Sequence, residues 1–112
     1  MTLSELTTQL KQTGYPVAYR YFPGDVLPQM PFIVYYVDET NNFFADGVVY
    51  RKISRVEVLL YTKQKNTTAE ATLEAILEGL AWEKSEEWIQ DEACTEITYN
   101  FEILEEGEIQ NG

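Results

Sequence analysis

The stretch from Phe32 to Lys63 constrains the fold most, because it contains two apolar runs separated by a polar connection. The first run is rich in β-branched and aromatic residues, which favour strands. The second run alternates at its far end, with Val56, Val58 and Leu60 in one phase, as in a strand with one buried face. We interpret the two runs as a long β-hairpin onto which the rest of the chain packs.

Two amphipathic helices are predicted, one before and one after this hairpin. Thr2 and Glu5 form a capping-box pattern, and leucines at one helical face predict a first helix from Leu3 to Gln12. A second capping-box pattern begins at Thr67. The predicted core-facing stripe of the second helix is Leu73, Ile76, Leu77 and Leu80, and its predicted solvated side is Glu70, Glu74 and Glu78.

Three further strands are predicted from apolar alternation and turn residues. They are 17–22, an edge-type strand over 82–89 that is alternatively a loop reaching back, and a half-buried strand over 95–103. The predicted order is α-β-β-β-α-β-β in a single domain of residues 1–104, followed by an acidic tail of residues 105–112 that we expect to fray. We therefore predict an α+β fold, with a mainly antiparallel sheet of four to five strands and two helices packed on one face.

The residue types argue against catalysis. The chain has no histidine, so the commonest general acid–base group is missing, and its glycines are scattered singly and form no phosphate-binding loop. Cys94 is the only cysteine, which excludes an internal disulfide and is typical of a small buried apolar side chain. We predict that the protein is not an enzyme and uses no cofactor and no metal. Four clustered acids lack the spacing of a calcium loop and are interpreted as solvated surface: Glu86, Glu87, Asp91 and Glu92.

The net charge of −11 is unevenly distributed along the chain. Residues 1–66 carry seven bases and six acids, whereas residues 67–112 carry one base and thirteen acids. This balance disfavours nucleic acid and anionic membranes as partners, and no apolar run is long enough to span a membrane. If the bases and the acidic half form different faces, the surface suits a head-to-tail contact between copies; ordinary solvated charge is the alternative. The bases concerned are Arg51, Lys52, Arg55, Lys63 and Lys65.

The connection within the hairpin, residues 39–47, is the most unusual local feature. It is longer than a tight turn requires and carries Phe43 and Phe44 side by side. These aromatic residues either fold back as a local plug or anchor a neighbouring subunit or partner. The candidate interface consists of Asn42, Phe43, Phe44, Asp46, Arg51, Lys52 and Arg55.

Strand order and apolar spacing carry a resemblance to a known family. The stretches concerned are 30–36, 41–50 and 55–63, followed by a helix, Trp88 and the last strand, within a region from about Pro16 to Ile103. In these stretches the chain resembles small structural proteins of long-tailed phages and prophages of Gram-positive bacteria. Within that group it is most similar to the tail-completion or head–tail joining proteins, the tail terminators.

The resemblance implies a compact subunit that assembles with copies of itself into a six-fold ring at the head-facing end of the tail tube. Such a ring ends tube polymerisation, and its partners are the tail tube protein and the head connector or adaptor. The resemblance further implies a place in the virion neck after synthesis in the bacterial cytoplasm, and no catalytic residue. A negatively charged lining would repel passing DNA.

Three other functions are compatible with the sequence. The protein is alternatively a head-side adaptor or another minor structural protein of the neck. It is alternatively a module that binds a small molecule or peptide between its sheet and helices. The third alternative is an acidic inhibitor that mimics DNA, although the balanced charge of the first 66 residues argues against full mimicry.

Overall fold

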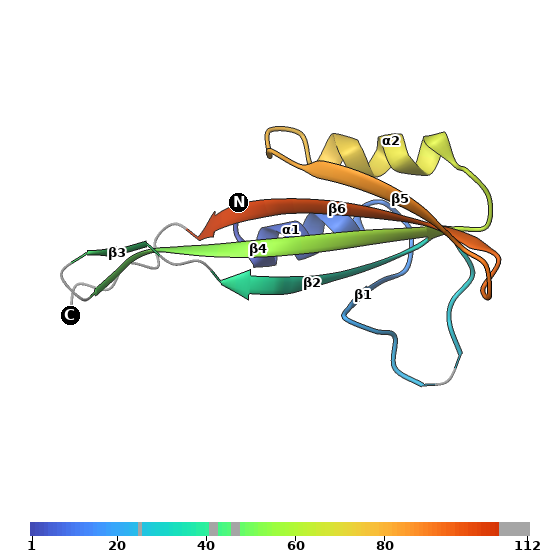
Figure 1. The fold of residues 1–112 in the computed structure, drawn as a ribbon, viewed down its shortest axis with the longest axis horizontal. Helices are drawn as coiled ribbons and strands as arrows, with labels where there is room; N and C mark the ends of the chain where they lie inside the picture. Colours follow the sequence, from blue (N-terminus) through green and yellow to red (C-terminus); the bar gives the residue numbers. More distant parts are fainter. Residues whose placement is uncertain (25, 41–42, 46–47, 106–112) are drawn as a thin grey trace.

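The computed structural model describes residues 1–24, 26–40, 43–45 and 48–105; for 43–45, 48–51 and 105 it describes the backbone alone. Within this part of the chain the elements are α1 (Leu3–Lys11), β1 (Val17–Tyr19), β2 (Phe32–Thr40), β3 (Phe43–Ala45), β4 (Val48–Thr62), α2 (Thr67–Ile76), β5 (Glu83–Ile89) and β6 (Cys94–Glu105). Five strands pair in the order β1-β2-β4-β6-β5, and β3 pairs with β4 alone (Figure 1). The predicted α+β fold is confirmed.

The predicted hairpin forms the centre of the sheet. β2 and β4 are antiparallel, and Tyr35 lies opposite Val58. β6 pairs with the other edge of β4, where Tyr99 lies opposite Val58. The sheet is mixed because β1 pairs with β2 in parallel. The long central strand is therefore hydrogen-bonded on both sides, and the shorter strands β1 and β5 form the edges.

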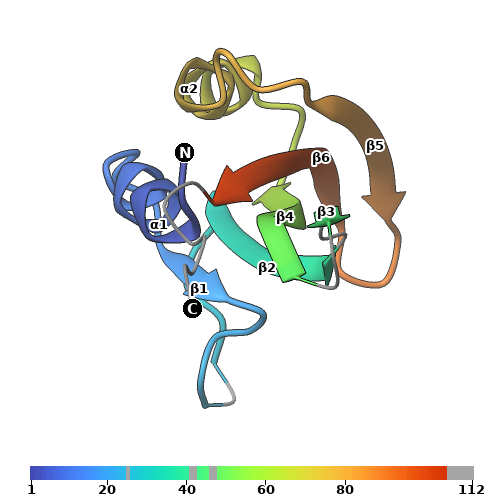
Figure 2. The same ribbon diagram turned by 90° about the vertical axis from the view of Figure 1, so that its left-hand side faces the viewer.

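Both helices lie on the same face of the sheet, as Figure 2 shows in a view along the strands. The core lies between the helices and this face. The predicted alternation in β4 is confirmed, since Val56, Val58 and Leu60 are fully buried. The buried apolar residues that complete this core are Leu6, Leu10, Ile33, Tyr35, Ala69, Leu73, Leu77, Ile97, Tyr99, Phe101 and Ile103.

The first helix forms as predicted, with a capping box. Thr2 Oγ1 accepts a hydrogen bond from the Glu5 amide at 3.1 Å, and the Thr2 amide donates to Glu5 Oε1 at 2.7 Å. The strand that follows ends at Tyr19, three residues earlier than predicted. Arg20 has a φ of 70°, and this left-handed turn takes the chain away from the sheet.

The second helix differs from the prediction at its start and on one side. Its N-cap is Asn66, whose side chain accepts a hydrogen bond from the Ala69 amide at 2.9 Å, so the expected capping box at Thr67 is wrong. Glu70 was expected on the solvated side of the helix but is buried. The reason is an ion-pair network between this helix and β5, which periodicity within one helix does not reveal.

The predicted irregular connection of residues 39–47 contains a strand. β2 continues to Thr40, and β3 pairs with the first part of β4, with Phe43 opposite Arg51 and Ala45 opposite Val48. We call β3 and residues 48–52 of β4 the ribbon; it projects beyond one end of the sheet (Figure 1). The longest dimension of the molecule is 50 Å. No helix in the described ranges is long and apolar enough to cross a membrane.

Candidate interaction surfaces

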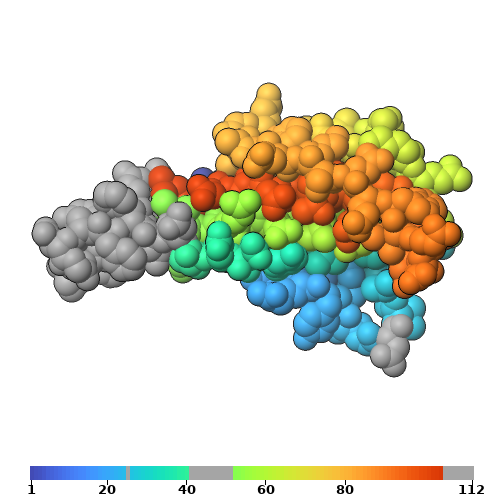
Figure 3. Space-filling view, viewed as in Figure 1, coloured from blue at the N-terminus to red at the C-terminus, as the bar shows by residue number. Residues whose placement is uncertain are grey.

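The sheet face opposite the helices has no helix over it. Figure 3 views this face, and β5, β6, β4 and β2 are visible next to one another across it. Val34, Leu59 and Thr98 lie side by side across the three central strands of this face, and all are half-buried. One end of the face is partly covered by the long connection between β1 and β2, which lies below the sheet in Figure 1. The candidate site is at that covered end.

A groove of about 420 Å³ lies between this connection and the uncovered face. Phe32 and Tyr61 stack at its floor, with ring centroids 5.1 Å apart, and Phe22 packs edge-on against Phe32. Other side chains that line it come from the β1–β2 connection and from β2, β5 and β6: Leu27, Met30, Val34, Ile89, Cys94 and Glu96. The groove is therefore mostly apolar and has a carboxylate in its wall.

Arg20 holds the connection against the sheet. Its amide donates to the Tyr35 carbonyl at 2.9 Å, and its guanidinium lies 5.3 Å from the centre of the Tyr36 ring. The guanidinium also donates to the Val37 carbonyl at 3.5 Å. A cation over an aromatic face is an attractive arrangement. These contacts position the start of the connection, and hence one wall of the groove.

The connection exposes three large apolar side chains. Tyr21 is 72%, Val26 82% and Leu27 59% exposed. Sequence analysis missed these residues as site candidates. The available signal was a set of apolar residues in a proline- and glycine-containing connection that belongs to no helix or strand. Tyr21 and Leu27 also line the groove, and exposed apolar side chains at such a place commonly mark a binding surface.

The opposite wall of the groove is acidic. Glu96 Oε2 accepts a hydrogen bond from the Tyr61 hydroxyl at 2.6 Å. Burial and this hydrogen bond raise the pKa of Tyr61, so its hydroxyl stays a donor. The pKa of the Cys94 thiol is also raised, mainly because the thiol is buried and secondly because the negative charge of Glu92 is near. Cys94 is buried, as predicted, and its thiol stays protonated at neutral pH.

An ion-pair network joins α2 to the edge strand β5 on the other face. Glu70, whose side chain is 6% exposed, lies 2.9 Å from Lys65 Nζ and 2.7 Å from Lys84 Nζ. Lys84 also contacts Glu74 at 2.7 Å, and the Tyr99 hydroxyl donates to Glu74 at 2.7 Å. We call Lys65, Glu70, Glu74 and Lys84 the clamp.

The clamp sets the pKa values of its members. Burial alone would raise the pKa of Glu70, but the hydrogen bonds from Lys84 and Lys65 outweigh it and lower the pKa below its usual value. The hydrogen bond from Lys84 likewise lowers the pKa of Glu74. The pKa of Lys65 is raised, chiefly by its hydrogen bonds to Glu86 and Glu70. The pKa of Lys84 is raised, chiefly by its hydrogen bonds to Glu70 and Glu74. The clamp is ionised at neutral pH and fastens α2 to β5.

The structure separates the predicted interface residues. Phe43 and Phe44 lie in β3, and Arg51 lies opposite Phe43 in β4. Lys52 lies opposite Glu105 of β6, where the ribbon joins the sheet, so four of the seven residues belong to the ribbon. Arg55 lies farther along β4, opposite Glu102 on the uncovered face. Two predicted interface residues, Asn42 and Asp46, fall outside the described residues.

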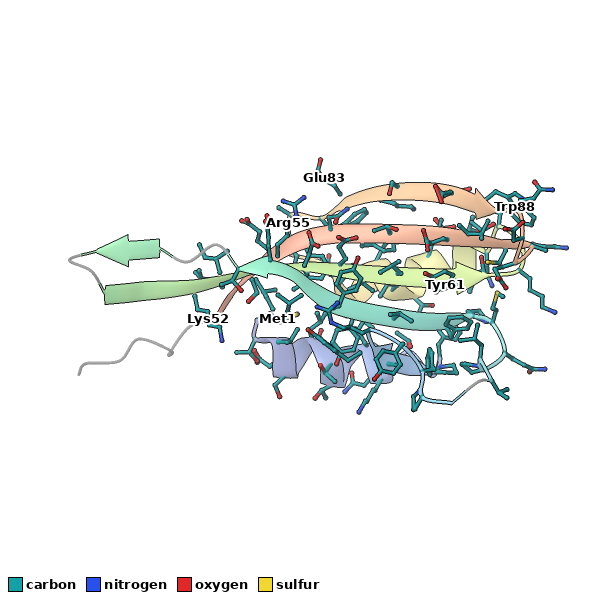
Figure 4. The ribbon with its side chains drawn as sticks, turned by 60° about the horizontal axis from the view of Figure 1, so that its bottom comes forward. Met1, Lys52, Arg55, Tyr61, Glu83 and Trp88 are labelled. Atoms are coloured by element: carbon teal, nitrogen blue, oxygen red, sulfur yellow. The ribbon has the colours of Figure 1, made fainter. Side chains whose placement is uncertain are left out.

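The five bases do not form one face. Figure 4 shows Lys52 and Arg55 towards the ribbon, and Tyr61 and Trp88 at the far end of the molecule. Lys63 and Lys65 come two and four residues after Tyr61 and therefore lie near that far end. Lys65 belongs to the clamp. The condition for a head-to-tail contact between a basic and an acidic face is not met, because β4 carries the two groups of bases to opposite ends. Only Arg51, Lys52 and Arg55 accompany the ribbon.

The acidic residues 86, 87, 91 and 92 lie on β5 and in the turn after it, and all are exposed. In the described part of the chain no three His, Cys, Asp or Glu side chains are grouped so that they could hold a metal ion. The sequence matches no protein-family model and has no significant similarity to a curated protein.

Proposed function

We propose that the protein is a structural component of the neck of a long-tailed phage. In this proposal copies of the chain form a six-fold ring that terminates the tail tube and joins it to the head connector. Its partners are then other copies of itself, the tail tube protein and the connector or adaptor protein. The ring size and these partners follow from the resemblance of the sequence to tail terminators.

The observation that carries the proposal is the ribbon. A small domain gains no core of its own from a two-stranded extension beyond its sheet, because isolated hairpins are only marginally stable in water. Such an extension is useful when it contacts a neighbour. The ribbon also carries two adjacent phenylalanines and an arginine, which are residue types enriched in protein interfaces.

The surface charge is compatible with a place beside a DNA channel. Acids are exposed along β5 and the turn that follows it, and the only base among residues 67–112 is Lys84, which the clamp engages. A surface of this charge repels DNA and does not retain it during passage. The orientation of β5 towards the channel is part of the proposal.

The direct test is electron microscopy of a lysate in which the gene carries a stop codon in place of Trp88. We expect full heads beside detached or overlong tails, because the truncated chain lacks all of β6. Joined virions of normal length would overturn the proposal and would favour the ligand-binding or inhibitor alternatives. A copy of the intact gene supplied in trans should restore joined virions.

A double substitution of Phe43 and Phe44 by serine should leave the domain folded and weaken this restoration of joined virions. The reason is that the ribbon lies beyond the core, so its aromatic residues serve contact and not folding. Circular dichroism reports the fold, and the titre of infectious particles after complementation reports assembly. We expect a loss of at least about tenfold, since a central aromatic anchor is worth about 2 kcal/mol or more.

The matched control is Trp88→Ser, which also removes an exposed aromatic side chain but lies outside the ribbon. This variant should complement. If the phenylalanine variant loses its circular dichroism signal, the two residues belong to the core and the ribbon is not an interface. If it is folded and complements as wild type, the ribbon is likewise excluded as an interface.

A further inference from the structure

We propose that the groove beside the β1–β2 connection receives the ribbon of a neighbouring copy. The inference deepens the proposed function and rests on it for the ring, because it names the surface that the ribbon contacts. The groove has an apolar floor of stacked Phe32 and Tyr61, and Tyr21 and Leu27, which also line it, are exposed. Aromatic residues that enter an apolar pocket are the usual anchors of protein interfaces.

The charge of the groove selects its occupant. Its far wall contains Glu92 and Glu96, and the turn beside it carries Asp91. Arg20 is the only base that lines the groove, and its guanidinium is engaged by the Tyr36 ring and the Val37 carbonyl. An occupant that is both aromatic and basic is therefore favoured.

The ribbon is the segment of this chain with that chemistry. Phe43 and Phe44 are adjacent in β3, and Arg51 and Lys52 are adjacent in the strand that pairs with it. The other close pair of bases is Lys63 and Lys65, and Lys65 is engaged by Glu70 and Glu86. Among the described segments, the ribbon thus combines aromatic residues with bases that the clamp does not use.

The placement of the two surfaces excludes a contact within one copy. The ribbon projects from one end of the molecule, and the groove lies at the other end beside Tyr61 (Figures 1 and 4). Each copy therefore has a ribbon at one end of its long axis and a groove at the other end. Contacts between two different surfaces add copies head to tail and close into a ring when the rotation permits.

A cross-linking experiment with two full-length variants tests this contact. The donor carries Phe44→Cys in the ribbon and Leu27→Asp to disable its own groove. The receiver carries Leu27→Cys in the groove, with Phe43→Ser and Phe44→Ser to disable its own ribbon. Leu27 is 59% exposed, so its replacement should leave the fold unchanged. Because Cys94 also lines the groove, both variants and the control receiver carry Cys94→Ala. Mixed under oxidation, the two should form a disulfide-linked heterodimer, whereas neither should cross-link efficiently alone.

The matched control is a receiver whose cysteine is at Thr8, an exposed position on α1 away from the groove. The Leu27→Cys receiver should give about tenfold more heterodimer, because docking raises the local concentration of the two thiols. Glu92→Lys in the receiver should reduce the yield. A donor with Lys52→Cys in place of Phe44→Cys provides a second position if the first variant does not fold. Equal yields for the Leu27 and Thr8 receivers would overturn the contact.

The cross-linking result tests the groove contact, and the stop-codon lysate tests the neck function, so either proposal can fail without the other. If cross-linking fails while the stop-codon lysate contains unjoined heads and tails, the neck function stands and the groove binds something else. If cross-linking succeeds while virions are normal, the copies associate through the groove but the neck function is wrong.

Discussion

Replacing Val58 with aspartate is expected to leave the chain unfolded at neutral pH. Val58 is fully buried at the centre of β4, between Tyr35 and Tyr99 on the neighbouring strands. Among the described residues, the buried set contains no lysine or arginine that could pair with a carboxylate there. Burial raises the pKa of a carboxyl group by several units, and a shift of this size corresponds to a loss of about 5 kcal/mol in the free energy of unfolding at neutral pH. This approaches the whole stability of a typical domain, roughly 5–15 kcal/mol.

Far-ultraviolet circular dichroism and thermal unfolding provide the measurement, and Leu59→Asp provides the control. Leu59 is the next residue of β4 but lies on the uncovered face, opposite Thr98. A carboxylate at this position reaches water, so the control should keep a cooperative transition at a lower temperature. If Val58→Asp unfolds with the same midpoint as the control, the assignment of the core to the helix-covered face is wrong.

Replacing Lys84 with methionine is expected to lower the free energy of unfolding by about 2 kcal/mol. Lys84 contacts both Glu70 and Glu74, and Glu70 is buried. Loss of one partner from a buried ion pair costs about 3–5 kcal/mol, and the remaining Lys65 reduces that cost. Methionine retains a comparable apolar stem, so the change reports charge and hydrogen bonding. Urea unfolding at neutral pH measures it.

The matched control is Lys65→Met, which removes the other lysine of the clamp. Lys65 is 49% exposed and therefore more strongly screened by water, so its removal should cost less than that of Lys84. A larger loss for Lys65→Met would contradict the ranking of the two contacts. Double variants with Glu74→Gln would separate the contribution of Glu74 from that of Glu70.

The effect of Lys84→Met should also depend on pH in a defined direction. The lowered pKa values of Glu70 and Glu74 mean that their ionised forms stabilise the fold above the usual carboxyl pKa of 4.5. This contribution is lost as the pH falls through the folded-state values below 4.5. The difference between wild type and Lys84→Met should therefore shrink towards about pH 3. A difference that is constant with pH would exclude an electrostatic origin.

Elements whose signals are local in the chain were predictable. The capping box at Thr2 and the alternation of Val56, Val58 and Leu60 each occupy a few consecutive residues, and both appear in the structure. The hairpin was predictable because two apolar runs flank a polar connection. In each case the physics is short-range: a cap satisfies nearby amides, and a two-residue period places side chains on one face.

Features made by distant segments were not predictable. Glu70 is buried because Lys65 and Lys84 approach it from two sides, and no helical period encodes that. The groove combines residues from the β1–β2 connection, β4 and the β5–β6 turn, which meet only in the folded sheet. β3 lies within residues 39–47, which the sequence predicts as a loop, because this short strand pairs beyond the end of the sheet.

The continuity of β4 from the ribbon through the sheet has a mechanical consequence. A pull on the ribbon along the strand axis acts directly on the central strand, which is bonded to β2 on one side and to β6 on the other. In antiparallel pairs the hydrogen bonds are perpendicular to the strands, so such a pull shears many of them together and does not open them one at a time. The same fold that presents the ribbon is thus suited to bear tension through it.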